Sequence, residues 1–379
     1  MSATAELNSG VSWDAVRSRF PGAIRCVYLN TAGGGPLSDA AYQAAQSYYR
    51  AVYGDGDLGW PDWQQRVESI RGRLADFLGA TPRDVAFLGN ASAALNAAAE
   101  LAPPGEVLSG AREFPSVTMP WIVRNRRVRF VDDAGDGLLT LESVEAAMTK
   151  ETRVLALSHV QYASGARLDL EALGALCRER GIMFVCDATQ SFGAFPLDVQ
   201  KIQPAALVFS GYKWACAGYG VAGLYLSPEL RAWKAPPLAG WRSAQSPYDL
   251  EARAPTFTTD ARALELGHPP VPGVFTLGGA LQVTTDVGID RIAERIHLLV
   301  DRLHAGLDDR GFKIDTPRQR DRHSGITMVR IDDPERTRSH LQKRGIFTSI
   351  RGGKLRVSLH LFNNEADIEQ LLHALDEVR

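Results

Sequence analysis

Short apolar runs alternate with longer helix-like stretches between about residue 80 and residue 230, and this alternation constrains the possible folds most strongly. The apolar runs are residues 85–88, 128–131, 154–157, 183–186 and 206–209. The intervening stretch from Leu170 to Arg180 is typical of a helix and ends at Gly181, a residue common just past helix C-termini. Strand–helix alternation predicts a mostly parallel sheet with helices on both faces, and continuous apolar runs suit strands buried on both faces.

The last third of the chain follows a different pattern. Residues 235–273 are rich in Pro, Gly, Ser and Thr and predict an irregular connection. A helical stretch from about Leu277 to Arg310 comes next, then strand-like runs at 325–331 and 354–359. A closing helix runs from about Glu365 to Val378. This order predicts helices packed on a small antiparallel sheet.

The length of 379 residues fits one large domain and a smaller one. We expect a large α/β domain over residues 26–255 and a small C-terminal α+β domain over residues 256–379. The N-terminal segment, residues 1–25, is expected to pack with the small domain. The active site would then lie between the two domains.

Composition excludes several classes of protein. The formal net charge of −2 gives no global field that would favour nucleic acid or an anionic membrane. No apolar run reaches the roughly 18 residues needed to span a bilayer. The four cysteines form no CxxC pair and have no spacing typical of a zinc site. The N-terminus carries no secretory signal, so we expect a cytoplasmic protein without a metal.

A lysine follows the strand-like run at 206–209. The sequence there is Ser210-Gly211-Tyr212-Lys213-Trp214, with Gly218 and Gly220 shortly after. A lysine just past a buried strand is partly desolvated, which lowers its pKa and favours the nucleophilic neutral amine. Such an amine can form a Schiff base with an aldehyde cofactor. The alternative is an ordinary solvated lysine in a loop. The flanking glycines and aromatic residues disfavour that interpretation.

A carboxylate, Asp187, follows the apolar run at 183–186 and precedes Lys213 by 26 positions. Pyridoxal-5′-phosphate (PLP) needs a carboxylate beside its ring nitrogen, so that the protonated ring acts as an electron sink. The spacing leaves room for one more strand between Asp187 and Lys213. The alternative is a helix N-cap aspartate after a strand.

A turn of small residues, from Gly89 to Ser92, joins the run at 85–88 to an alanine-rich helix. Free N–H groups and the positive end of the helix dipole make such a turn a phosphate seat, to which Ser92 could add a hydroxyl. A plain N-cap explains the same residues equally well. No Gly-Lys-Ser/Thr follows, so the turn is not a Walker P-loop.

An arginine, Arg356, lies on the late strand-like run at 354–359. An arginine can hold a substrate carboxylate with two parallel hydrogen bonds. Taken alone, it is more typical of an exposed arginine on an edge strand.

Together these segments resemble the class V aminotransferase family, whose members are fold type I PLP enzymes such as cysteine desulfurases, cysteine lyases and kynureninases. The resemblance extends from Tyr28-Leu29-Asn30-Thr31-Ala32 to Arg356-Val357-Ser358 and the final helix. It implies the α/β fold of PLP-dependent transferases, with a mostly parallel sheet flanked by helices and a smaller α+β domain. It also implies PLP as the cofactor and a homodimer with active sites at the interface.

The resemblance implies a role for individual residues around the cofactor. Lys213 would be the Schiff-base lysine and would later move the substrate α-proton. Asp187 would pair with the pyridine nitrogen, and Gln190 would hydrogen-bond the phenolic oxygen. Phe114 would stack on the ring. The phosphate would be held by the Ala91 backbone, Ser92 and Ser210.

The resemblance also implies residues that bind the substrate. Arg356 would bind the carboxylate of a small amino acid, with Asn30 and Thr31 lining the mouth of the site. Tyr162 stands where many relatives have an asparagine facing the ring. His268, in Gly267-His268-Pro269-Pro270, stands where the family often reaches the phosphate of the neighbouring subunit.

Several positions depart from the family pattern. Phe114 replaces a histidine that many relatives use and so keeps the stacking but loses a proton donor. Tyr212 stands where many relatives have a histidine before the lysine. Desulfurases carry a nucleophilic cysteine shortly before the carboxylate arginine, whereas residues 346–353 here hold none. A desulfurase that forms a persulfide on the enzyme is therefore not expected.

We expect β-elimination from a cysteine-like amino acid, a carbon–sulfur lyase reaction without a persulfide cysteine. Transamination to a keto acid is the alternative, and epimerisation or a kynureninase-like hydrolysis stays open. A nicotinamide dehydrogenase would need a GxGxxG turn, but Gly33-Gly34-Gly35-Pro36 lacks that spacing. A PLP-fold protein without catalysis is disfavoured because the lysine, the aspartate and the arginine are all present.

Overall fold

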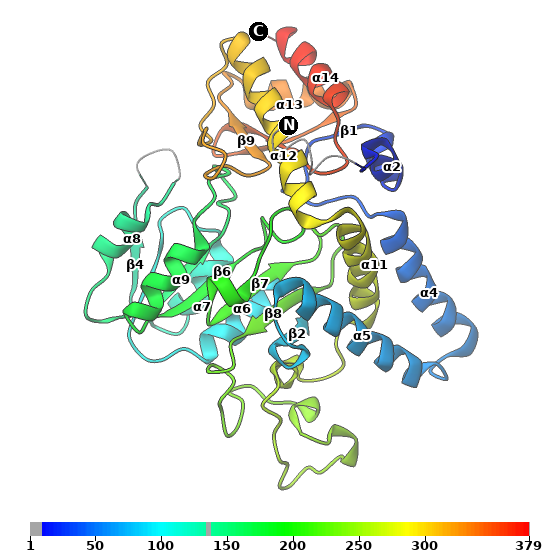
Figure 1. The fold of residues 1–379 in the computed structure, drawn as a ribbon, viewed down its shortest axis with the longest axis vertical. Helices are drawn as coiled ribbons and strands as arrows, with labels where there is room; N and C mark the ends of the chain where they lie inside the picture. The colour runs from blue at the N-terminus through cyan, green and yellow to red at the C-terminus, as the bar shows by residue number, and fades with distance from the viewer. Residues whose placement is uncertain (1–9, 134–137, 379) are drawn as a thin grey trace.

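The structure is a computed structural model that describes residues 10–133 and 138–378. Its main feature is a seven-stranded sheet in the order β2-β8-β7-β6-β5-β3-β4 (Figure 1). Strand β8 pairs antiparallel with β2 and β7, and the remaining pairs are parallel. The strands are β2 (Val85–Leu88), β3 (Glu106–Gly110), β4 (Val128–Val131), β5 (Thr152–Ser158), β6 (Met183–Asp187), β7 (Ala206–Ser210) and β8 (Ala222–Leu226). The mostly parallel sheet predicted from the sequence is confirmed.

Alternate side chains of each strand fill the two faces of this sheet. In β5, Leu155 and Leu157 join the core cluster that includes helices α5, α9 and α11, whereas Val154 and Ala156 join the cluster that includes α6 and α7. Burial on both faces explains why these strands have continuous apolar sequences. The helices of this domain are α4 (Asp39–Asp55), α5 (Trp60–Leu78), η1 (Pro82–Asp84), α6 (Ala91–Glu100), α7 (Pro115–Ile122), α8 (Leu141–Ala147), α9 (Leu170–Glu179), α10 (Val199–Ile202) and α11 (Val271–Val287).

A smaller layer of helices and strands lies beyond the carboxyl ends of the parallel strands (Figure 1). Its three-stranded antiparallel sheet has the order β11-β12-β9, and a separate parallel pair joins β1 to β10. The elements are β1 (Val27–Tyr28), α12 (Ile289–Asp309), β9 (Ile326–Val329), α13 (Pro334–Lys343), β10 (Ile346–Phe347), β11 (Ser349–Arg351), β12 (Lys354–Ser358) and α14 (Glu365–Asp376).

The N-terminal helices α2 (Trp13–Ser18) and α3 (Pro21–Ile24) pack against this smaller layer. Val16 and Phe20 belong to the same core cluster as residues of α12 and α14. Arg17 forms an ion pair with Asp367 at 2.7 Å. The early and late parts of the chain therefore share one core.

The long helix predicted from about Leu277 to Arg310 is wrong in one respect: it is two helices, α11 and α12. They meet at Gly288, whose φ of 93° ends α11, because glycine adopts this left-handed backbone without steric cost. The connection at 235–273 holds three short helices, η2 (Trp241–Ser243), η3 (Pro247–Asp249) and η4 (Ala261–Glu265).

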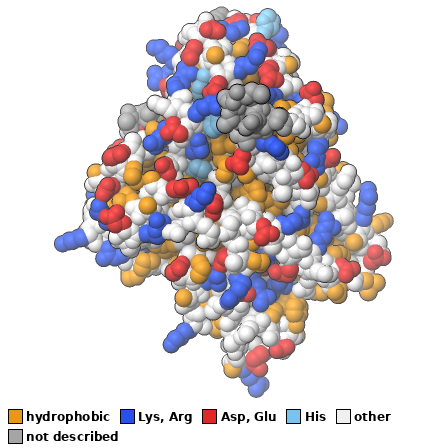
Figure 2. All heavy atoms as spheres, viewed as in Figure 1, with side chains coloured by type: hydrophobic (Ala, Val, Ile, Leu, Met, Phe, Trp, Pro, Cys, Tyr) orange, Lys and Arg blue, Asp and Glu red, His pale blue; other side chains and the backbone are white. Residues whose placement is uncertain are grey.

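Both signs of charge are spread over the face of the molecule seen in Figure 2, with apolar side chains among them. This agrees with the small net charge of the chain. Of the helices in the described residues, none has the length and apolar character that crossing a bilayer requires.

Candidate active site

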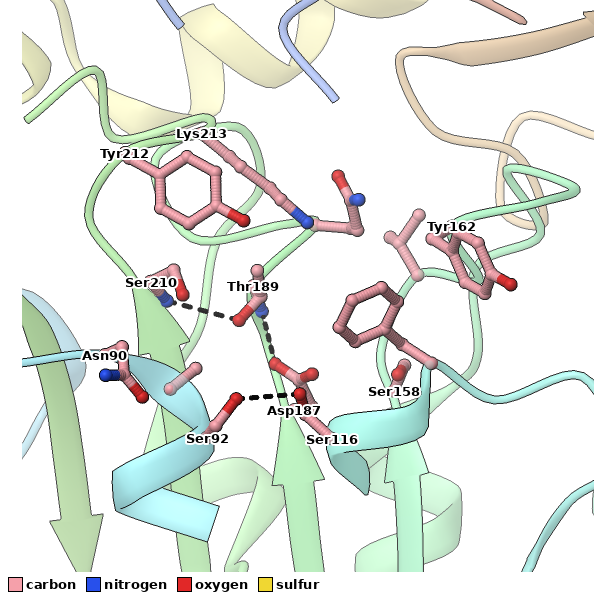
Figure 3. Close-up of a pocket in the computed structure, with 14 residues that line it drawn as sticks. Asn90, Ser92, Ser116, Ser158, Tyr162, Asp187, Thr189, Ser210, Tyr212 and Lys213 are labelled. Atoms are coloured by element: carbon pink, nitrogen blue, oxygen red, sulfur yellow. Dashed lines mark hydrogen bonds between the residues drawn. The ribbon is translucent and has the colours of Figure 1, made fainter. Parts of the chain in front are cut away.

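A pocket lies where the carboxyl ends of the parallel strands meet, the edge at which open α/β sheets bind ligands (Figure 3). Most of the site residues predicted from the sequence line it, while Asn30, Thr31, His268 and Arg356 do not. The lining residues are Asn90, Ala91, Ser92, Phe114, Ser116, Ser158, Val160, Tyr162, Asp187, Thr189, Gln190, Ser210, Tyr212 and Lys213.

Lys213 follows β7 and is only 8% exposed. Burial lowers the pKa of its amine to about 8; Asp187 opposes this shift, and the charges of Arg356 and Arg351 add to it. The amine nitrogen lies 5.6 Å from the ring centroids of both Phe114 and Tyr212. At neutral pH Lys213 therefore has a larger neutral fraction than an ordinary surface lysine.

The chain around Lys213 is held in a tight turn. Gly35 donates its N–H to the carbonyl of Tyr212 at 2.8 Å, and a Cβ at Gly35 would lie 2.3 Å from the carbonyl oxygen of Lys213. Only glycine fits there. The ring of Tyr212 stacks on Tyr219 with centroids 4.4 Å apart, which fixes the tyrosine beside the lysine.

Asp187 is the last residue of β6 and is buried. Its Oδ1 accepts a hydrogen bond from the backbone N–H of Thr189 at 2.8 Å, and the hydroxyl of Thr189 accepts one from the N–H of Ser210 at 3.2 Å. Burial raises the pKa of Asp187, while its hydrogen bonds and the Lys213 charge lower it. The carboxylate is thus fixed at the strand end and directed into the pocket (Figure 3).

Two helices begin at the pocket. Asn90 caps α6 by accepting from the N–H of Ala93 at 2.9 Å, and α7 begins directly after Phe114. The hydroxyls of Ser92 and Ser116, one from each first turn, lie 2.8 Å apart. Hydroxyls and helix N-termini favour an anion, and Asp187 is the one acidic side chain among the lining residues.

Arg356, on β12, is 1% exposed and lies behind Tyr162. Its Nη1 donates to the backbone carbonyl of Tyr162 at 3.2 Å, and its Nε donates to the hydroxyl of Ser349 at 3.1 Å. In the described part of the chain, Nη2 has no hydrogen-bond partner and no acidic side chain pairs with this guanidinium. Burial and the nearby charge of Arg351 together lower its pKa to about 10, against a smaller opposing effect of Tyr162 and Tyr212. A buried cation with a free N–H is suited to bind an anionic group.

Gln190 lines the pocket, and its amide is engaged on both sides. Oε1 accepts from the indole N–H of Trp214 at 2.7 Å, and Nε2 donates to the carbonyl of Ala32 at 3.2 Å. Asn30 and Thr31 lie next to Ala32 in the sequence. Asn30 Oδ1 and Thr31 Oγ1 are buried polar atoms without a partner in the described residues, so both could accept a ligand or water.

His268 lies outside this pocket. Its exposed ring contacts two tryptophans edge-on, with centroids 4.6 Å from Trp60 and 5.0 Å from Trp241. Its expected contact with the phosphate of a neighbouring subunit stays a prediction.

Several pocket residues were not predicted from the sequence. Ser116, Ser158, Val160 and Thr189 line the pocket, and the clue available for each was its position at or just after a strand end or a helix start. Glu113 does not line the pocket but holds Ser158, which does. Its carboxylate accepts hydrogen bonds from the backbone N–H and the hydroxyl of Ser158. Burial raises the pKa of Glu113 to about 7.

The residues present fit PLP. A partly neutral lysine, a buried carboxylate at a strand end, an aromatic side chain and a hydroxyl-rich pair of helix N-termini share one pocket. These are the donors and acceptors that an aldehyde, a ring nitrogen, an aromatic face and a phosphate require.

Comparisons with known proteins agree with this chemistry. A family model described as aminotransferase class-V matches residues 27–371. The chain is 28% identical over 338 residues to a probable cysteine desulfurase of Pyrococcus abyssi, with 83% of each chain covered. It is 25% identical over 365 residues to the uncharacterized aminotransferase YcbU of Bacillus subtilis, with 96% of each chain covered.

A solved structure shares the same fold. The apo cysteine desulfurase from Thermococcus onnurineus NA1 has a TM-score of 0.86 to this chain at 24% sequence identity. The match covers 96% of this chain and 97% of that one, so both layers of the molecule are included.

Proposed function

Because the chain belongs to the aminotransferase class-V family and is a PLP-dependent enzyme, we propose that it catalyses β-elimination from a cysteine-like amino acid. The family, the fold type and the cofactor expected from the sequence are confirmed. The reaction and the residue roles below are proposals.

We choose this reaction because no cysteine in the pocket is available to accept sulfur from the substrate. None of the four cysteines lines the pocket; Cys177, Cys186 and Cys216 are buried. Burial raises the pKa of the Cys216 thiol, the nearest of them to Lys213 in the sequence, so it is a poor nucleophile. A relative is named a probable cysteine desulfurase, which supports a cysteine-like substrate. Because no thiolate is available to accept the sulfur, the sulfur substituent is released from the substrate as a separate product.

PLP in this pocket supplies an electron sink that stabilises negative charge at the substrate α-carbon. Lys213 would hold the cofactor and, with its lowered pKa, accept the α-proton. Asp187 would hold the ring nitrogen, Gln190 the phenolic oxygen, and Phe114 the ring face. The phosphate would lie against Ala91, Ser92 and Ser210.

Arg356 would bind the substrate carboxylate through its unpartnered N–H. The substrate loses a proton from Cα and its sulfur substituent from Cβ; after hydrolysis the products of cysteine are pyruvate, ammonia and hydrogen sulfide. The phenol of Tyr212 keeps its proton at neutral pH, as an ordinary tyrosine does, and burial raises its pKa further. Phe114 cannot donate a proton, so Tyr212, which also lines the pocket, is the candidate donor in place of the histidine that many relatives have.

We also propose a cytoplasmic homodimer. Support comes from exposed aromatic side chains on one face of α4, where Tyr42, Tyr49 and Tyr53 are 53%, 60% and 95% exposed. Exposed aromatic surfaces of this kind are typical of protein interfaces.

Incubation of the PLP-loaded protein with cysteine, cystine, S-conjugates and other amino acids tests the reaction. Mass spectrometry would identify both the released keto acid and the final form of the cofactor. Pyruvate with PLP regenerated supports the lyase. A keto acid that matches the input amino acid, together with pyridoxamine phosphate, would make the protein an aminotransferase. The similarity to YcbU motivates that second candidate. The Lys213→Ala variant is the control and should abolish turnover.

A further inference from the structure

The partners of Gln190 determine which end of its amide is which. An indole N–H can only donate, and a backbone carbonyl can only accept. Because Trp214 Nε1 lies 2.7 Å from one end and the Ala32 carbonyl 3.2 Å from the other, the first end is the oxygen and the second the nitrogen. The amide oxygen is thus engaged by Trp214, and the second N–H of the amide is left for the pocket.

Each partner of Gln190 is held in turn by the segment that carries Arg356. The N–H of Ala32 donates to the hydroxyl of Ser358 at 3.1 Å, and Ser358 ends β12. The carbonyl of Trp214 lies 2.8 Å from Nε2 of His360. Since a carbonyl only accepts, Nε2 of His360 carries the proton. Ser358 and His360 follow Arg356 at alternate positions.

The indole itself has little freedom. Trp214 is 1% exposed, its ring lies edge-on to His360 with centroids 5.3 Å apart, and a Cβ at Gly325 would lie 2.6 Å from it. A buried tryptophan needs some acceptor for its N–H. Trp121, equally buried, satisfies this need with the backbone carbonyl of Val117 in its own helix. Trp214 instead uses a side chain that lines the pocket.

We propose that Trp214 is a positioning residue that locks the amide of Gln190, so that only N–H groups face the phenolic oxygen of the cofactor. This rests on the proposed role of Gln190 toward PLP. The inference extends to β12: the segment proposed to bind the substrate carboxylate also holds both partners of the amide.

The proposal predicts the sign of a spectroscopic change. An N–H directed at the oxygen stabilises its negative charge and so favours loss of a proton from the bound cofactor. If the amide turned over, its oxygen would face that negative charge and would favour retention of the proton. Loss of the indole N–H leaves the 3.2 Å contact with the Ala32 carbonyl as the one remaining restraint among the described contacts, so the turned amide becomes populated and the titration of the cofactor should move to higher pH.

The test is the pH midpoint of the visible absorption band of the PLP-loaded protein, measured without substrate. Trp214→Phe keeps an aromatic ring and removes the N–H, and we expect the midpoint to rise by about one pH unit. Gln190→Glu is the positive control, because it directs an acceptor at the pocket even with Trp214 intact, and its midpoint should rise too. Trp121→Phe is the matched control and should keep the wild-type midpoint.

Two results would overturn the proposal. In the first, Trp214→Phe titrates like the wild type while Gln190→Glu shifts; Trp214 then does not orient the amide. In the second, neither variant shifts; Gln190 then does not face that oxygen. If Trp214→Phe fails to fold, β-(3-benzothienyl)alanine at position 214 replaces the N–H with sulfur at nearly the same shape, and the same shift is expected.

Failure of the proposed function gives a different result. If the wild-type protein with PLP shows no visible band that borohydride fixes onto Lys213, the assignment of the lysine fails before the amide is tested. A wild-type band with no effect of Trp214→Phe contradicts only the positioning role.

Discussion

Lys213 and Arg356 are both cations that the fold removes from water. Asp187 offsets part of the cost for Lys213, whereas Arg356 has only a hydroxyl and a carbonyl among its described partners. An isolated buried charge is unfavourable unless it is paired. Both residues therefore reduce the stability of the ligand-free protein. The bound cofactor and substrate would offset this cost of burying charge.

The lowered pKa of Lys213 predicts its reactivity. In the protein without cofactor, the rate of PLP binding should rise with pH and level off above about pH 8, because the neutral amine is the nucleophile. Asp187→Asn removes a charge that raises this pKa, so its profile should move to lower pH. Stopped-flow absorbance would measure both profiles. An unchanged profile in Asp187→Asn would contradict the electrostatic coupling.

Arg356 should separate stability from binding. Arg356→Met should leave the free energy of unfolding within about 1 kcal/mol of the wild type or raise it, because it removes an unpaired buried charge. It should weaken amino-acid binding roughly 100-fold. Urea denaturation and spectral titration would measure the two effects. Arg351→Met, which changes the exposed neighbour, is the control and should change binding far less.

Sequence patterns singled out Lys213, Asp187 and Arg356 because each lies in or just after a strand with a clear apolar pattern. The first two line the pocket and Arg356 does not, and the roles of all three stay predictions. The role of Trp214 was not predictable, since it depends on contact with Gln190, Gly325 and His360, which the fold brings together from distant segments. Asn30 and Thr31 directly precede Ala32, the backbone partner of Gln190, but do not line the pocket.

Among the elements, helix α5, strand β2 and the short helix η4 are joined by a buried ion pair. Arg71 donates to Glu265 at 2.6 Å, and the same carboxylate oxygen accepts from the N–H of Phe87 at 3.0 Å. Arg71 also donates to the carbonyl of Val85. The pair thus fixes the edge strand β2, which leads directly to the start of α6 at the pocket.

Glu265→Ala should lower the free energy of unfolding by about 3 to 5 kcal/mol, because it leaves the buried Arg71 charge without its main partner. The double variant Arg71→Leu/Glu265→Ala should recover most of this loss, since no unpaired buried charge remains; Glu68, the other carboxylate that pairs with Arg71, has a side chain that is 48% exposed. Urea denaturation of the wild type, both single variants and the double variant measures the coupling. Equal losses in Glu265→Ala and the double variant would show that packing, not charge, dominates.

Strands buried on both faces were predictable because their sequences are continuously apolar, as in β5, β6 and β7. Strand β3, with the sequence Glu-Val-Leu-Ser-Gly, and strand β8, which contains Gly223, were not among the predicted runs because polar or small residues interrupt them. The break between α11 and α12 depends on the backbone of one glycine, Gly288, and the helical periodicity hides it.

At the scale of the whole molecule, the change in sequence pattern after residue 235 predicted a second layer of helices and strands. That pattern could not show which strands of the small layer pair with the N-terminal segment, because the pairing of β1 with β10 joins residues far apart in the chain. The oligomeric state also cannot be read from the structure of one chain, and we predict it below from the exposed face of α4.

We expect sedimentation equilibrium to show a dimer. The double variant Tyr49→Glu/Tyr53→Glu should shift it toward monomer, because charges on the exposed face of α4 oppose burial of that surface. Leu298→Glu, which adds a charge to a partly exposed position on α12, is the control and should stay dimeric. A wild-type monomer at micromolar concentration would contradict the proposed assembly.

The pairing of β1 with β10 also determines when the N-terminal segment can finish folding during synthesis. Val27 pairs with Ile346, so a ribosome releases the first strand about 320 residues before its partner. At roughly 5 to 20 residues per second, the opening segment waits on the order of tens of seconds. Val16 and Phe20 have no α12 to cover them for most of that interval, and no α14 throughout it. The beginning of this chain finishes folding only after its end has been synthesised.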